Sequence, residues 1–224
     1  MKRLHSTLLC SALCVMLLPL AALAAPTGIP GPRLAAQSQV NNRLEFHDAM
    51  RKLWEDHATW TRLYIVSDIQ ELPDVTANAE RLLQNQADIG SAIAPFYGAA
   101  AGDQLTALLT DHILIAVAVI DAVQANDSAA IAQELERWYA NADDIAELLH
   151  SVNPRNWPLE ELQAMLDEHL DLTTAEVLSY FAGDYPASVA DYEAVHLAIL
   201  EMADMLSSGI IRQFPQAFSP GRSR

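Results

Sequence analysis

The sequence predicts an all-α protein, an antiparallel helical bundle of five long helices and two short ones. Apolar residues recur at steps of three and four through most of the chain, and prolines separate the resulting segments. No stretch shows the alternation of apolar and polar residues that is typical of a half-buried strand. The connections between the predicted helices are short, which favours antiparallel neighbours.

The amino-terminal segment has the three parts of a secretory signal peptide. Lys2 and Arg3 supply a positive start, residues 8–23 are uncharged and apolar, and the A-L-A at 22–24 fits a cleavage site. A retained membrane anchor is the alternative, but Pro19 interrupts an apolar run that is shorter than the roughly 20 residues needed for a span. We therefore expect cleavage after this motif and a mature protein in the periplasm or outside the cell.

The predicted cleavage removes both cysteines and sets the start of the mature chain. Both cysteines, Cys10 and Cys14, lie in the signal peptide at residues 1–24. The mature chain then has no thiol for a disulfide, a thiolate zinc site or an iron–sulfur cluster. The rest divides into a flexible linker rich in proline and glycine, one helical domain and a loose tail. Their predicted ranges are 25–41, 42–215 and 216–224.

The first three predicted helices are long. Asn42 and Glu45 form a capping box that opens the first, and Pro73 ends it. The second is expected over residues 76–94 and the third over 99–125. The third is apolar on all sides in its middle, which indicates a central buried helix. The apolar row of the first helix consists of Phe46, Met50, Leu53, His57, Trp60 and Tyr64.

Two short helices lie between the last two long ones. Pro158 begins the first short helix, and a second capping box, Thr173 with Glu176, predicts a separate brief helix that ends near Gly183. The four helices of this half are expected over residues 128–152, 158–172, 173–183 and 186–214.

The charge balance limits the possible partners. The chain carries 29 acidic and 13 basic residues, with a net charge of −16 at pH 7. Such a surface repels phosphate backbones and anionic headgroups, so we expect no nucleic-acid binding and no stable membrane insertion of the mature chain. Metal cations, small molecules and a protein partner remain compatible with it.

Four histidines lie on the apolar rows of four different predicted helices. They are His57, His112, His169 and His196. Imidazoles that face a bundle interior are suited to hold a metal ion, because a ring nitrogen there meets little competition from water. Zinc or copper is the expected ion, with Glu193 as a further ligand. The alternative is that each histidine is a packed core residue.

Known metal-bundle classes fit the pattern poorly. Glu193 and His196 match the E-x-x-H step of di-iron bundles, but such sites need two of these motifs and two more glutamates. The sequence also lacks a P-loop, a G-x-G-x-x-G, a nucleophile elbow and an H-E-x-x-H. We therefore expect a protein that is not an enzyme, with a metal-centre enzyme as a lesser alternative.

A second, polar group lies mainly on the second and fourth predicted helices. Its members are Arg62, Arg81, Asn85, Asp88, Asn141 and Asp144. They are candidates either for a buried network that fixes helix register or for the lining of a small-ligand pocket. The four tryptophans are expected to pack the core.

Several short stretches carry a resemblance to known proteins. They are LWEDH at 53–57, WTR at 60–62, RLLQN at 81–85, PFYG at 95–98, NADD at 141–144 and QFP at 213–215. They resemble a group of small exported bacterial all-helical proteins of unestablished function, over most of the mature chain. The resemblance implies a single-domain bundle and assigns no functional residue.

These observations favour an exported cell-envelope protein that binds a metal ion or small ligand inside the bundle. The alternative is a structural or protein-interaction bundle, of an envelope-stress or adaptor type, whose histidines are merely packed. The spatial separation of the four imidazoles distinguishes the two hypotheses.

Overall fold

The computed structural model describes the backbone of residues 32–219 and the side chains of residues 42–219. Within this range the protein is all-helical, with six α-helices, one short 3-10 helix and no strand. The predicted signal peptide and residues 220–224 of the predicted tail lie outside the described residues. The elements are α1 (Pro32–Ile69), α2 (Val75–Tyr97), α3 (Ala99–Gln124), α4 (Ser128–Val152), α5 (Leu159–Phe181), α6 (Tyr185–Gln213) and η1 (Pro215–Phe218).

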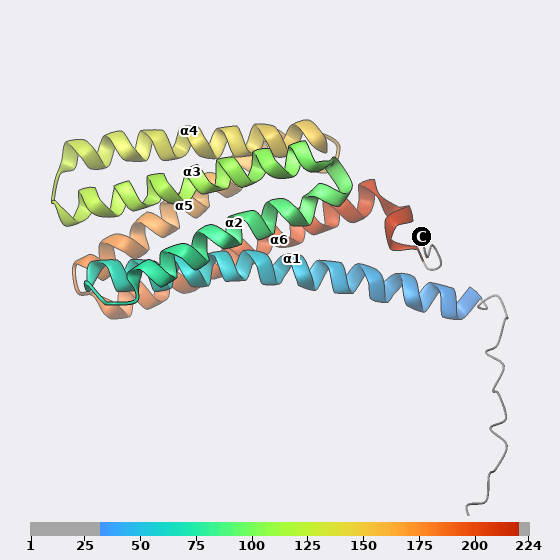
Figure 1. The fold of residues 1–224 in the computed structure, drawn as a ribbon, viewed down its shortest axis with the longest axis horizontal. Coiled ribbons are helices and arrows are strands. Elements are labelled where there is room, and N and C mark those ends of the chain that lie inside the picture. Colours follow the sequence, from blue (N-terminus) through green and yellow to red (C-terminus); the bar gives the residue numbers. More distant parts are fainter. Residues whose placement is uncertain (1–31, 220–224) are drawn as a thin grey trace, which may run out of the picture.

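The six helices form a bundle that is closed on itself (Figure 1). Each helix packs against the next one along the chain, and α6 returns to pack against α1. In addition, α1, α3 and α5 contact one another. These three helices therefore face the centre of the bundle, and side chains on their inner faces meet there.

The core follows the predicted apolar rows. Met50, His57 and Tyr64 of α1 are buried, and their row neighbours Phe46, Leu53 and Trp60 pack against the core from partly buried positions. The other three tryptophans, Trp54, Trp138 and Trp157, are buried as predicted. The steps of three and four thus identified the inner face of the first helix correctly.

Two predicted helix boundaries are wrong. The predicted count of five long and two short helices is therefore wrong as well. Residues 159–181 form one continuous helix, α5, within which Thr173 Oγ1 donates a hydrogen bond backward to the carbonyl oxygen of His169 at 2.7 Å. A threonine bonded in this way sits inside a helix and does not cap a new one. Likewise α1 begins at Pro32 rather than at Asn42, so residues 32–41 of the predicted linker are helical.

Helices α2 and α3 approach each other closely through two glycines. A Cβ atom built on Gly90 lies 2.0 Å from Thr106 Oγ1 and 2.5 Å from the carbonyl oxygen of Gly102. One built on Gly102 lies 2.7 Å from the carbonyl oxygen of Gly90. The two backbones therefore pack at a separation that no side chain at these positions permits.

Helices α3 and α6 have the length and apolar composition of a membrane span. In each, 44% of the apolar window is buried inside the bundle, and a core helix passes the same test of length and composition.

Candidate functional site

Three histidines from α1, α3 and α5 meet at the centre of the bundle. His57, His112 and His169 are each no more than 3% exposed. The ring centroids of His57 and His169 are 5.6 Å apart, and those of His112 and His169 are 6.2 Å apart. Because the odd-numbered helices face one another, three of the four predicted histidines come together.

One of the three has a fixed tautomer. His112 Nδ1 lies 2.9 Å from Asn141 Oδ1, and Asn141 Nδ2 donates to the carbonyl oxygen of Leu108 at 3.1 Å. Since that amide orientation leaves Oδ1 as an acceptor, His112 Nδ1 carries the proton and donates it. His112 Nε2 therefore keeps its lone pair, which is the form a metal ligand needs.

The other two histidines have unpaired nitrogens. Among the described residues no hydrogen-bond partner lies at His57 Nδ1 or at His169 Nδ1, although both atoms are fully buried. Such groups are uncommon, since an unsatisfied buried polar atom costs about 1–3 kcal/mol. A cavity of about 10 Å³ lies between the rings. It is lined by Trp54, His57, Leu109, His112, Ile145, Leu166, His169, Ile199 and Met202.

The size of this cavity limits its occupant. About 10 Å³ is at the lower limit for one water molecule and is too small for an organic ligand. As the side chains stand, the described part of the chain has no three His, Cys, Asp or Glu residues placed to hold a metal ion. A small molecule inside the bundle, as the sequence suggested, therefore has no room in this conformation.

Burial keeps the three imidazoles neutral. It lowers the pKa of His57 to about 4, against a weaker opposing effect of the nearby Gln86 side chain. It lowers the pKa of His112 to about 3, with a further lowering by the nearby His57. The pKa of His169 is also lowered well below its ordinary value, by burial first and then by the other two histidines. Near neutral pH the bundle centre therefore carries no charge.

The fourth histidine lies elsewhere, which corrects its predicted inward position. His196 is partly exposed on α6, where Nε2 is 3.2 Å from Glu55 Oε1 and the ring stacks on Tyr192 at 6.0 Å. Glu193 is exposed. The buried stripe in this part of α6 runs through Ser188, Val195 and Ile199, so His196 is displaced from it by about 100°.

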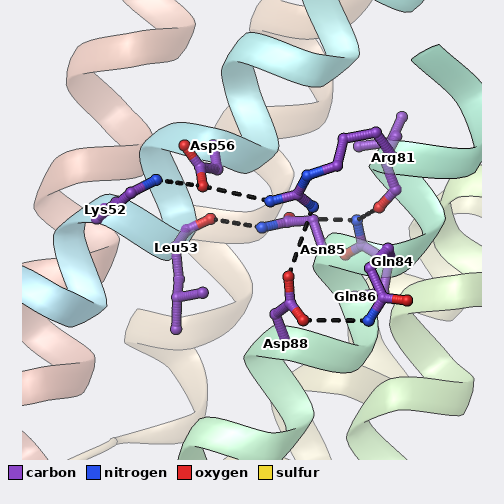
Figure 2. Close-up of polar contacts among 9 residues, drawn as sticks. Lys52, Leu53, Asp56, Arg81, Gln84, Asn85, Gln86 and Asp88 are labelled. Atoms are coloured by element: carbon purple, nitrogen blue, oxygen red, sulfur yellow. Dashed lines mark hydrogen bonds and ion pairs between the residues drawn. The ribbon is translucent and has the colours of Figure 1, made fainter. Parts of the chain in front are cut away.

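The six predicted polar residues do not form one pocket. Arg81 lies 3.5 Å from both Asp56 and Asp88, and Asn85 Nδ2 donates to the carbonyl oxygen of Leu53 at 3.0 Å (Figure 2). The contacts with Asp56 and Leu53 join α1 to α2, as the register hypothesis requires, whereas Arg81 and Asp88 both lie on α2. Asn141 instead contacts His112, and Asp144 lies exposed on α4. Arg62 lies apart from both groups.

Arg62 is partly buried and pairs with the buried Glu176, which was not among the predicted site residues. Arg62 Nη1 donates to Glu176 Oε1 at 3.0 Å and to Ser188 Oγ at 2.6 Å, and its guanidinium lies 4.9 Å from the ring centroid of Tyr180. Glu176 is buried, which raises its pKa to about 7 although Arg62 opposes the shift. The sequence signal at Glu176 was misassigned to a capping box, where the side chain would bond to its own helix.

The raised pKa of Glu176 predicts a specific pH dependence of stability. The folded state binds this proton more tightly than the unfolded state, so the stabilisation is present below about pH 4.5 and is lost as the pH rises towards 7. The free energy of unfolding of the wild type, minus that of Glu176→Gln, should fall by about 1 kcal/mol per pH unit between pH 5 and 7. Urea denaturation across this range measures it. Glu193→Gln, at an exposed position, is the control, and a pH-independent difference for Glu176→Gln would contradict the prediction.

Comparison with known proteins identifies no relative of this chain. No protein-family model, no curated protein and no solved structure matches the chain.

Proposed function

We propose that the chain is an exported, non-enzymatic protein of the cell envelope that holds one metal ion between His57, His112 and His169. Two observations carry the proposal: two buried imidazole nitrogens have no hydrogen-bond partner, and all three rings line a cavity large enough for a single small ion. A bound divalent ion would satisfy both nitrogens and the free lone pair of His112 at once. The proposal includes the antiparallel course of the helices, which their short connections support.

The separation of the rings supports a site that forms by small side-chain movements. With zinc–nitrogen bonds of about 2.1 Å, the ring centres of two ligands in a tetrahedral site lie about 5 Å apart. The observed separations are 5.6 and 6.2 Å. Binding then requires that the rings turn about their side-chain bonds until one nitrogen of each faces the cavity. Imidazole ligands favour zinc or copper among the divalent ions.

A second candidate is a protein-interaction bundle whose neutral histidines only fill the core. A run of exposed apolar side chains around the α5–α6 turn favours it, because solvent-facing residues of this kind often mark contact surfaces. Its members are Leu178, Phe181, Tyr185 and Val189. In this case metal ions have no effect on the folded protein.

Thermal melts of metal-free protein with and without zinc or copper distinguish the two candidates. An ion that binds only the folded state stabilises it by about 2.7 kcal/mol at a hundredfold excess over the dissociation constant. For a domain of this size the melting temperature should then rise by about 5–10 °C. His57→Leu and His169→Leu, which keep the side-chain volume nearly constant, should each remove this increment, whereas His196→Ala at the surface should retain it.

Two results would contradict metal binding at this site. An unchanged wild-type melting temperature across both titrations would leave the interaction bundle as the better hypothesis. An increment that persists in His57→Leu and His169→Leu would place the ion at surface histidines instead.

A further inference from the structure

One end of the bundle carries a polar hollow that is independent of the histidine site. It lies where the connection between α4 and α5 meets the carboxyl end of α6, and its volume is about 430 Å³. Its lining consists of Asn153, Pro154, Arg155, Asn156, Arg212 and Gln213. Pockets of a few hundred Å³ are in the range that binds small molecules.

The charge of this hollow is unusual for the protein. The chain has a net charge of −16, yet neither Arg155 nor Arg212 has a carboxylate within 4.0 Å among the described residues. Most of the other described basic side chains are paired with acids: Arg51 with Asp204, Lys52 with Asp56, Arg62 with Glu176, Arg81 with Asp56 and Asp88, and Arg137 with Glu134. In a chain with such an excess of carboxylates, two unpaired arginines in one hollow leave a positive site open to an external anion.

A chain of hydrogen bonds holds one of these arginines in place. Arg212 Nε donates to Asn156 Oδ1 at 3.0 Å, and Asn156 Nδ2 donates to Asn153 Oδ1 at 2.8 Å. Asn153 is 1% exposed and donates through Nδ2 to Tyr97 Oη at 3.1 Å. Because only Nε of Arg212 is used in this chain, its two terminal nitrogens remain available to a ligand.

The arginines are not needed to cap the end of α4. Gln213 Nε2 donates to the carbonyl oxygen of Val152 at 3.1 Å, at the end of α4. The backbone amide of Asn153 is bonded to the carbonyl oxygens of Leu149 and His150. Since amides satisfy these carbonyl groups, the guanidinium groups do not have that role.

We propose that this hollow binds a small oxyanion, the carboxylate or phosphate group of a low-molecular-weight ligand, through Arg155 and Arg212. The planar guanidinium fork matches both groups through paired hydrogen bonds. The amide side chains of the hollow are engaged with one another and with the backbone, so the two guanidinium groups supply the contacts to the ligand. The site differs from the proposed metal site in place and in the charge of its ligand, so either proposal can fail without the other.

Titration of metal-free protein with inorganic phosphate and, separately, with succinate tests this site. Binding is followed by the NMR signals of the Nε–Hε groups of Arg155 and Arg212, so that Arg155 reports binding in the Arg212 variants and Arg212 reports it in Arg155→Ala. The expected result is a saturable shift of the Arg212 signal with at least one probe, and the stronger probe identifies phosphate or carboxylate as the preferred group. Arg155→Ala and Arg212→Ala should each weaken binding at least tenfold, while Arg212→Lys, which keeps the charge without the fork, should weaken it less.

Arg137→Ala is the matched control, because Arg137 is exposed on α4 and paired with Glu134. It removes the same charge and should leave binding unchanged. Melting temperatures of all four variants verify that they are folded. A shift that does not saturate with either probe, or an equal loss in Arg137→Ala, would overturn the proposal.

Discussion

Acidification is expected to unfold the metal-free protein steeply below about pH 6. In the folded state burial lowers the pKa of His57 to about 4 and that of His112 to about 3, and the pKa of His169 is lowered as well. In the unfolded chain all three return to about 6.5 and bind protons more readily. The stabilisation that depends on the neutral rings is therefore full above pH 6.5 and is lost as the pH falls towards 4.

The expected slope is large because three groups act together. Each contributes up to about 1.4 kcal/mol per pH unit, so the three histidines together should lower the free energy of unfolding by up to about 4 kcal/mol per pH unit in this window. That is a large part of the 5–15 kcal/mol by which folded proteins are ordinarily stable. Above pH 5 the opposite dependence of Glu176 offsets about 1 kcal/mol per pH unit of this fall. Urea denaturation at pH 7.5, 6, 5 and 4.5, in the presence of a chelator, measures the slope.

Two substitutions isolate the histidine contribution from the carboxylates that also titrate in acid. His57→Leu and His169→Leu remove rings whose Nδ1 atoms have no partner, so they break no hydrogen bond of those atoms. Each substitution should reduce the slope by the contribution of one proton, up to about 1.4 kcal/mol per pH unit, and the double variant should reduce it by the contribution of two. The partly exposed His196 is the control, and His196→Ala should keep the wild-type slope. An acid midpoint that is unchanged in the double variant would show that other groups cause the acid unfolding.

Gly90→Ala is expected to destabilise the protein by about 3 kcal/mol, which lowers the melting temperature by about 6–12 °C. In an ordinary helix this change would stabilise by about 1 kcal/mol, because alanine is the better helix former. Here the new methyl group would overlap Thr106 Oγ1 and the carbonyl oxygen of Gly102, and the second is backbone that moves only with α3. The sign of the effect therefore reverses.

Thermal and urea denaturation measure this effect, and two further variants define its cause. Adding Thr106→Ala to Gly90→Ala should recover only part of the loss, since the contact with the carbonyl oxygen of Gly102 remains. Ala164→Gly, at an exposed position of α5, gives the ordinary cost of a helical glycine, about 1 kcal/mol. A neutral or stabilising Gly90→Ala would show that α2 and α3 separate without cost.

The helical class and the inner face of most helices could be predicted from the sequence. Steps of three and four decide which residues share a face, and this local rule placed His57, His112 and His169 inward. The same rule was inaccurate on α6, where the true stripe passes through Val195 and left His196 at the surface. When the buried face of a helix is assigned from residue types alone, the assignment is uncertain by one residue, because residues next to the buried row are also apolar. One residue corresponds to a rotation of about 100° around the helix axis.

Which side chains meet in the bundle could not be predicted from the sequence and is seen in the packed structure. The depth of each histidine depends on how the helices slide along one another, so the cluster of three and its small cavity required the packed bundle. Arg62 of α1 pairs with Glu176 of α5, although the sequence pattern at Thr173 and Glu176 equally fits a helix start. The arginine hollow joins Arg155 and Arg212, which are far apart in the chain and share no periodic pattern. Sequence periodicity carries only local information, whereas these sites are made by contacts between distant segments.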